Sequence, residues 1–195
     1  MSRLAVFGYA SLVSRASAGE TLGRDVQACP PARLHGWRRR WSLLRDNHRA
    51  EKTFARADDR TLPDFVLGLN VEPGGEPGDA PNGVLIELTD GELERLDIRE
   101  IRYDRVDVTD AIDTPGTERF DRIVAFSAKP ENHAPDPPDR AVILRPYAET
   151  VERAFAELGP EHRRLYLETT QPPPVEVIDA ILVRDAIPPG NPRGW

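Results

Sequence analysis

Hydrophobic and polar residues follow two periods along this chain, and the first of them predicts strands. Short apolar runs, and runs in which apolar and polar residues alternate, are typical of strands with at least one buried face. Such runs predict strands at residues 4–7, 33–44, 65–71, 83–88, 103–109, 122–128 and 175–183.

The second period, apolar residues three or four positions apart, predicts helices between the strands. Thr89 and Glu92 have the spacing of a capping box, in which each side chain satisfies an amide group at the start of a helix. A helix should follow with Leu93 and Leu96 on its buried face and end near Glu100. Further helices are predicted at residues 14–23, 146–158 and 161–169.

Strands and helices are intermixed without the regular spacing of βαβ units, which favours the α+β class over a doubly wound sheet. We expect a single domain over residues 1–186, with a mixed or antiparallel, partly barrel-like sheet and flanking helices. Segments 73–81 and 129–140 are rich in proline or glycine and predict connectors. Residues 187–195 predict a Pro/Gly-rich C-terminal tail.

Composition narrows the functional classes. The 195 residues are 39% hydrophobic and 30% charged, which is typical of a soluble globular protein. The net charge of −7 argues against nucleic acid as a partner, because nucleic-acid binders usually carry a basic face. No apolar run approaches the roughly 18–20 residues of a membrane span, and the first residues are too polar for a signal peptide. The single cysteine cannot form an intrachain disulfide, so we predict a cytoplasmic protein.

Several residues that could carry chemistry have simpler interpretations. The four histidines are scattered without ligand spacing, so no metal site is predicted. Cys29 lacks a partner motif and should be inert. The arginines at 38–40 should point to alternate faces of a strand and form a solvated face, with a phosphate site as the lesser alternative. Trp37 and Trp41 should belong to the core.

Two separated segments carry the strongest functional signal. The first is Phe7–Leu12, with the sequence FGYASL, and the second is Leu96–Arg105, with the sequence LDIREIRYDR. Together they resemble the γ-glutamylcyclotransferase superfamily, in which a strand ends in an aromatic-Gly-Ser-Leu loop and a Leu-Asp-x-x-Glu segment with a following tyrosine comes much later. Leu34–Trp37 and Asn82–Leu85 also resemble strands of that family. The resemblance covers about the first two thirds of the chain.

Two positions depart from the family pattern. Ala10 stands where the family usually has glycine, so the loop must keep ordinary dihedral angles there or shift slightly, with Gly8 as a compensation. Ile101 follows Glu100 where glycine is common. These departures bear on substrate preference more than on fold.

The resemblance implies a fold and a reaction. The α-amine of a γ-glutamyl amino acid or amine would attack its own γ-carbonyl, release the attached amine and form 5-oxoproline. The substrate supplies its own nucleophile, so the resemblance implies neither a catalytic serine or cysteine nor a metal or organic cofactor. Glu100 would be the general acid/base, which requires a raised carboxyl pKa. Backbone amides of the loop Gly8, Tyr9, Ala10, Ser11 and Leu12 would hold the substrate, and the Tyr103 hydroxyl would bind it or orient Glu100.

Other readings of the same residues stay open. Glu100 could be a solvated residue at a helix end, Gly8–Leu12 a turn that only terminates a strand, and Tyr103 a packing residue. The chain could also be an enzyme of the same fold for another γ-glutamylated metabolite, or a small-molecule-binding module without turnover. The sequence does not specify an oligomeric state.

Overall fold

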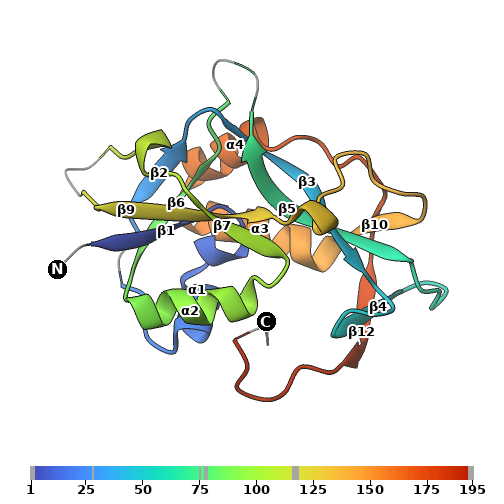
Figure 1. Ribbon diagram of the computed structural model, residues 1–195. Helices are drawn as coiled ribbons and strands as arrows, with labels where there is room; N and C mark the ends of the chain where they lie inside the picture. Colours follow the sequence, from blue (N-terminus) through green and yellow to red (C-terminus); the bar gives the residue numbers. More distant parts are fainter. Residues whose placement is uncertain (1–2, 28, 75, 77–78, 116–118, 193–195) are drawn as a thin grey trace.

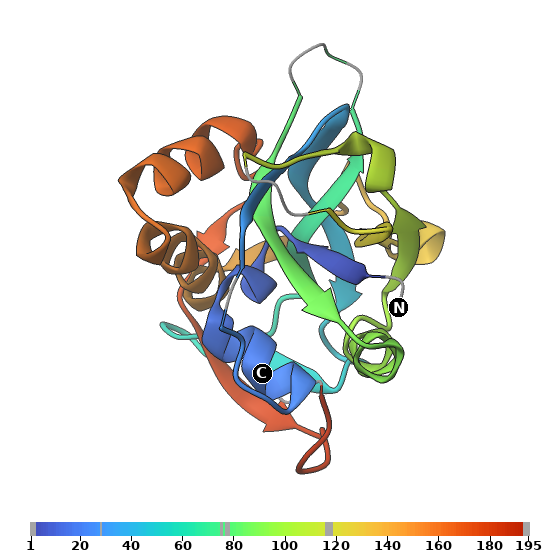
Figure 2. The same ribbon diagram turned by 90° about the vertical axis from the view of Figure 1, so that its left-hand side faces the viewer.

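The computed structural model describes residues 3–27, 29–74, 76, 79–115 and 119–192. Within these residues the strands form three sheets, and four α-helices lie against them (Figure 1). The protein is therefore of the α+β class, with a mixed sheet that curls into part of a barrel, as the sequence predicts (Figure 2).

The largest sheet has six strands in the order β7-β9-β1-β6-β2-β8. Only the pair β1 and β9 is parallel; the other neighbours are antiparallel. Its strands are β1 (Leu4–Gly8), β2 (Pro31–Leu34), β6 (Asn82–Leu88), β7 (Tyr103–Asp107), β8 (Ile112–Asp113) and β9 (Arg122–Ala128).

A four-stranded sheet has the order β11-β10-β5-β3, in which β3 and β5 are antiparallel and the other pairs parallel. Its members are β3 (Trp37–Asp46), β5 (Phe65–Pro73), β10 (Ala141–Leu144) and β11 (Val177–Ile178). The third sheet is an antiparallel pair, β4 (Lys52–Arg56) with β12 (Ala180–Asp185).

Strands β5 and β9 join the two larger sheets side by side. Ser127 donates a hydrogen bond to the Val71 carbonyl (2.8 Å), and the Ala128 amide donates one to the Asn70 side chain (2.8 Å). The inner faces of both sheets then share one hydrophobic core, because alternate residues of each strand point inward. Phe7, Leu67, Leu69, Leu85 and Val124 belong to it, each 1% exposed or less.

The predicted helices are confirmed. Thr89 and Glu92 form the reciprocal capping box, and Leu93 and Leu96 lie on the buried face of the helix that follows. The α-helices are α1 (Arg15–Leu22), α2 (Asp90–Arg99), α3 (Arg145–Glu157) and α4 (Pro160–Thr169), and short 3-10 helices are η1 (Ser11–Val13), η2 (Thr109–Ala111) and η3 (Pro130–Asn132).

Several predicted strands were wrong in extent. The strand expected at 33–44 is two strands, β2 and β3, because Gly36 turns the chain with φ 75°. The strand expected at 175–183 breaks at Asp179 into β11 and β12, and the one expected at 103–109 ends at Asp107. Strands β4, β8 and β10 were not predicted, since they are short or pair with strands far away in the sequence.

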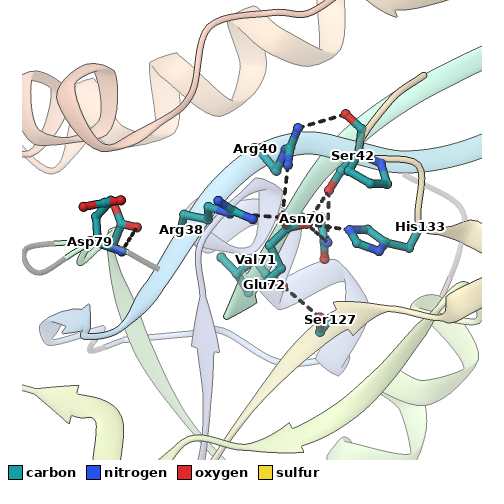
Figure 3. A network of polar contacts seen from close by, with 11 residues as sticks. Arg38, Arg40, Ser42, Asn70, Val71, Glu72, Asp79, Ser127 and His133 are labelled. Atoms are coloured by element: carbon teal, nitrogen blue, oxygen red, sulfur yellow. Dashed lines mark hydrogen bonds and ion pairs between the residues drawn. The ribbon is translucent and has the colours of Figure 1, made fainter. Parts of the chain in front are cut away.

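The solvated face predicted for residues 38–40 is wrong. The alternation of the strand places Arg39 on the inner face, where it is completely buried. Arg38 and Arg40 lie on the other face and contact the Glu72 carboxylate at 3.1 and 3.3 Å (Figure 3). His133 also contacts Glu72, at 2.6 Å, so this polar cluster ties the connector after η3 to β5.

Other expectations have mixed outcomes. Trp41 is 4% exposed and Trp37 packs partly buried against the core, as predicted. Cys29 is buried, and burial raises the pKa of its thiol. The domain boundary at residue 186 stays a prediction, and residues 193–195 of the predicted tail lie outside the described residues. No helix in the described ranges is long and apolar enough to cross a membrane.

Candidate functional site

A cavity of about 570 Å³ lies where β1, β3, β5, β7 and β9 meet the helices. Six of the seven residues that the sequence singled out line it: Tyr9, Ala10, Ser11, Leu12, Glu100 and Tyr103. Gly8 is not in its wall but precedes the loop at the end of β1. The fold therefore brings two segments about ninety residues apart to one cavity.

Glu100 caps the C-terminal end of α2, and its side chain is only 17% exposed. Burial raises the pKa of this carboxyl above its ordinary value, while the neighbouring Arg99 opposes the rise. A carboxyl group in this condition holds its proton more readily than one in water, which suits an exchange of protons near neutral pH. The interpretation of Glu100 as a solvated surface residue does not fit this position.

Arg99 connects Glu100 with the loop after β1. Its Nε lies 3.0 Å from a Glu100 oxygen, and its Nη2 donates to the hydroxyls of Ser11 (2.8 Å) and Ser17 (3.2 Å). Its Nη1 donates to the Thr21 hydroxyl in α1. Because Arg99 is 5% exposed, these contacts fix α1, α2 and the loop as one unit.

The loop itself is fixed by its backbone and by Tyr9. The Tyr9 hydroxyl donates to the Phe126 carbonyl (2.6 Å), and the Tyr9 carbonyl accepts from buried Arg39 (3.0 Å). The 3-10 helix starts at Ser11, and the first amides of a helix are not used by the helix itself. Ala10 has φ −136°, so the replacement of the family's glycine needs no left-handed backbone.

Three tyrosines enclose the space around Glu100. Tyr103 donates to the Leu69 carbonyl (2.9 Å), which orients its ring toward the cavity wall. Tyr147, from the first turn of α3, also lines the cavity. Burial raises the pKa of Tyr9, Tyr103 and Tyr147, and the Glu100 charge adds to each rise. The phenols therefore stay protonated, and those of Tyr9 and Tyr103 already donate their single proton to backbone carbonyls.

Sequence reasoning missed Arg99 and Tyr147. A signal for Arg99 was present, because it follows Leu96 by three residues and so shares the buried face of α2. Tyr147 carried no local signal that separates a core position from a cavity position. In the described part of the chain, no group of three or more histidine, cysteine or acidic residues is placed to hold a metal ion.

Comparison with known proteins bears on the fold. No family model and no curated protein matches the chain. Among solved structures, one titled "Gamma-glutamyl cyclotransferase" superposes with a TM-score of 0.55 at 14% identity, over 90% of this chain and 93% of that one. The chain has the γ-glutamyl cyclotransferase-like fold.

Two further structures agree with this fold. A yeast γ-glutamyl cyclotransferase described as specific to glutathione gives a TM-score of 0.51 at 15% identity, covering 87% of this chain and 96% of that one. YkqA from Bacillus subtilis gives 0.57 at 20% identity over 85% of this chain. The present chain spans about half of YkqA, 53% of its length.

Proposed function

We propose that this protein is a cyclotransferase that converts a γ-glutamyl amino acid or amine into 5-oxoproline and the free amine. One observation carries the proposal: a largely buried carboxyl with a raised pKa, Glu100, shares a cavity with the loop Tyr9–Leu12. The names of two proteins with this fold support the same reaction class.

The proposed reaction moves two protons from the substrate's α-nitrogen to the leaving nitrogen and needs no protein nucleophile. Glu100 would accept the first proton from the α-ammonium group, and the freed amine would attack the γ-carbonyl carbon. As the C–N bond to the leaving amine breaks, that nitrogen takes this proton from Glu100. Glu100 then accepts the second proton from the ring nitrogen and passes it to the released amine, which leaves as an ammonium ion, so the carboxylate is regenerated and atoms and charges balance.

The rest of the site would position the substrate. Amides at the start of η1 would stabilise negative charge on the carbonyl oxygen or the substrate's own carboxylate. Arg99 would keep the Glu100 carboxyl oriented, since its other nitrogens are held by Ser11 and Ser17. The enclosed tyrosines would hold a single folded conformer, which favours ring closure.

Mass spectrometry of 5-oxoproline tests the proposal. The purified protein should form it from γ-glutamyl amino acids or glutathione, and Glu100→Gln should lower the rate by on the order of 10²-fold or more. Glu94→Gln, an exposed change on the same helix, is the matched control and should retain the rate. Turnover that survives in Glu100→Gln would remove Glu100 from the mechanism, and no turnover by the wild-type protein would favour the binding module.

The stability of Glu100→Gln separates loss of chemistry from loss of fold. Above the ordinary carboxyl pKa, the native state binds more protons at Glu100 than the unfolded chain does, so ionisation of Glu100 lowers stability as the pH rises. Glutamine resembles the protonated acid and does not ionise. We therefore expect Glu100→Gln to melt no lower than wild type at pH 7, with the difference vanishing near pH 4.

A further inference from the structure

The cavity is also lined by side chains that the proposed Glu100 chemistry does not use. Among them are Arg45 of β3, Phe54 and Lys52 of β4, Arg102, and Leu182 of β12. The Arg102 guanidinium lies 2.9 Å from Glu51, and the Lys52 ammonium lies 3.7 Å from Asp185. Two of the three cations therefore have carboxylate partners.

Arg45 differs from both neighbours. Its Nε and Nη2 are buried, yet in the part of the chain that the structure describes neither has a hydrogen-bond acceptor. Its guanidinium lies over the Phe54 ring, 5.1 Å from the centroid, which holds the plane of the group. Burial lowers the pKa of Arg45 to about 10, and nearby Arg102 adds to the effect, so the charge is retained at neutral pH.

Nε–H and Nη2–H form one edge of the guanidinium, and that edge matches the two oxygens of a carboxylate. Leaving both donors buried without a partner costs free energy, which a ligand in the cavity would recover. The cavity wall also contains Glu20, Glu51 and Glu100 and is largely apolar. A singly charged carboxylate suits these surroundings better than a doubly charged phosphate does.

The strand register separates Arg45 from the position beside Tyr103. Leu43 pairs with Gly68, and a Cβ added at Gly68 would lie 3.8 Å from the Tyr103 hydroxyl. Arg45 pairs with Val66 two residues farther along the same face of β3. Positions 43 and 45 are roughly 7 Å apart along the strand, which is about the length of two residues of extended peptide. On the proposed function, we assign the group bound by Arg45 to the leaving nitrogen rather than to the ring that closes.

We propose that Arg45 binds a carboxylate on the leaving part of the substrate, so that γ-glutamyl amino acids or short γ-glutamyl peptides are preferred over γ-glutamyl amines that lack this group. This inference rests on the proposed cyclotransferase function. The stacking surface of Phe54 and the side chain of Leu182 also favour an apolar side chain on the same leaving group.

The test compares γ-glutamyl-leucine with its C-terminal amide, in which a neutral amide of similar size replaces the carboxylate. Wild type should turn over the acid with about 10- to 100-fold higher kcat/KM, as expected for a charged, two-point hydrogen bond. Arg45→Met should remove that preference by slowing the acid and leave the amide nearly unchanged. Arg49→Met is the matched control, since Arg49 is exposed and pairs only with Asp46 among the described ion pairs.

Two outcomes overturn the inference. Equal kcat/KM for acid and amide in wild type would exclude a carboxylate site while leaving the cyclotransferase function intact. A preference for the acid that survives in Arg45→Met would assign the recognition to another residue.

A binding measurement keeps the two proposals separate. If wild type forms no 5-oxoproline from either compound, the proposed function fails, and titration with N-acetyl-leucine and its amide decides the inference alone. Binding of the acid that Arg45→Met weakens at least 10-fold, without an effect on the amide, supports the carboxylate site. Absent binding, or binding that does not depend on Arg45, overturns it.

Discussion

Arg39 and Arg45 lie on the same strand, β3, and each guanidinium lies over an aromatic ring, but their hydrogen bonds differ completely. Arg39 stacks on Phe155 and Tyr166 and donates to the carbonyls of Tyr9 (3.0 Å) and Asn82 (2.7 Å). Its other donors reach the Asn82 side chain and the hydroxyls of Thr169 and Thr170. Arg45 has two donors without an acceptor in the described chain.

The difference indicates two roles for a buried guanidinium. Burial lowers the pKa of Arg39 to about 9 and that of Arg45 to about 10, so burial alone does not distinguish them. Satisfied donors mark Arg39 as part of the framework that holds the loop after β1. Unsatisfied donors facing a cavity mark Arg45 as a residue whose partner comes from outside the chain.

The largest effect should follow from Arg39→Met. The variant removes the donor to the Tyr9 and Asn82 carbonyls and to the Asn82 side chain, and each buried acceptor left alone costs about 1–3 kcal/mol. We expect the free energy of unfolding in urea to fall by at least about 3 kcal/mol. Arg38→Met is the control: Arg38 is partly exposed and Glu72 keeps its contacts with Arg40 and His133, so this change should cost under about 1 kcal/mol. An equal cost for both would contradict the framework role.

An intermediate effect should follow from Thr170→Val. The Thr170 hydroxyl accepts from Arg39 Nε (2.8 Å), so valine leaves one donor of Arg39 without its acceptor at nearly constant volume. We expect a loss of about 1–2 kcal/mol, measured as a lower urea midpoint with an unchanged slope. If Thr170→Val leaves the free energy of unfolding unchanged, the complete set of hydrogen bonds from Arg39 is not what stabilises this region.

The smallest change, and one of opposite sign, should follow from Arg45→Met. The substitution removes a buried charge whose donors are unsatisfied but also removes its contact with the Phe54 ring. The free energy of unfolding should stay unchanged or rise by up to about 1 kcal/mol, which is about 2–4 °C in Tm. A loss of more than about 1 kcal/mol in the free energy of unfolding would mean that Arg45 stabilises the fold as Arg39 does. The two arginines would then not have different roles.

The sequence predicted the helices and the site segments better than the strands. The capping box of α2 and the motifs around Tyr9 and Glu100 are local, so their residues could be recognised without the fold. Strand β10 is a short apolar run that continues directly into α3. The spacing of its apolar residues does not distinguish a strand from the start of the helix. Strand β4 was missed because its stabilising partner, β12, follows more than a hundred residues later.

The positions of Arg39 and Arg45 could be predicted only in part from the sequence. Alternation along a strand correctly separates Arg39 from its neighbours, but which face is buried depends on the second sheet and on α4. Arg45 could not be predicted as a cavity residue, because Phe54 and Leu182 come from strands that pair only in the folded chain. Arg99 could have been predicted as a buried residue, because the helical period that placed Leu96 correctly also applies to it.

The pairing of β4 with β12 has a consequence for the order in which the protein is made. Leu182 lines the same cavity as segments that leave the ribosome much earlier, including Tyr9 and Arg45. A nascent chain that already contains the β1 loop and Glu100 still lacks this part of the wall. Fragments that end before residue 180 should therefore bind small molecules in this cavity more weakly than the full chain does.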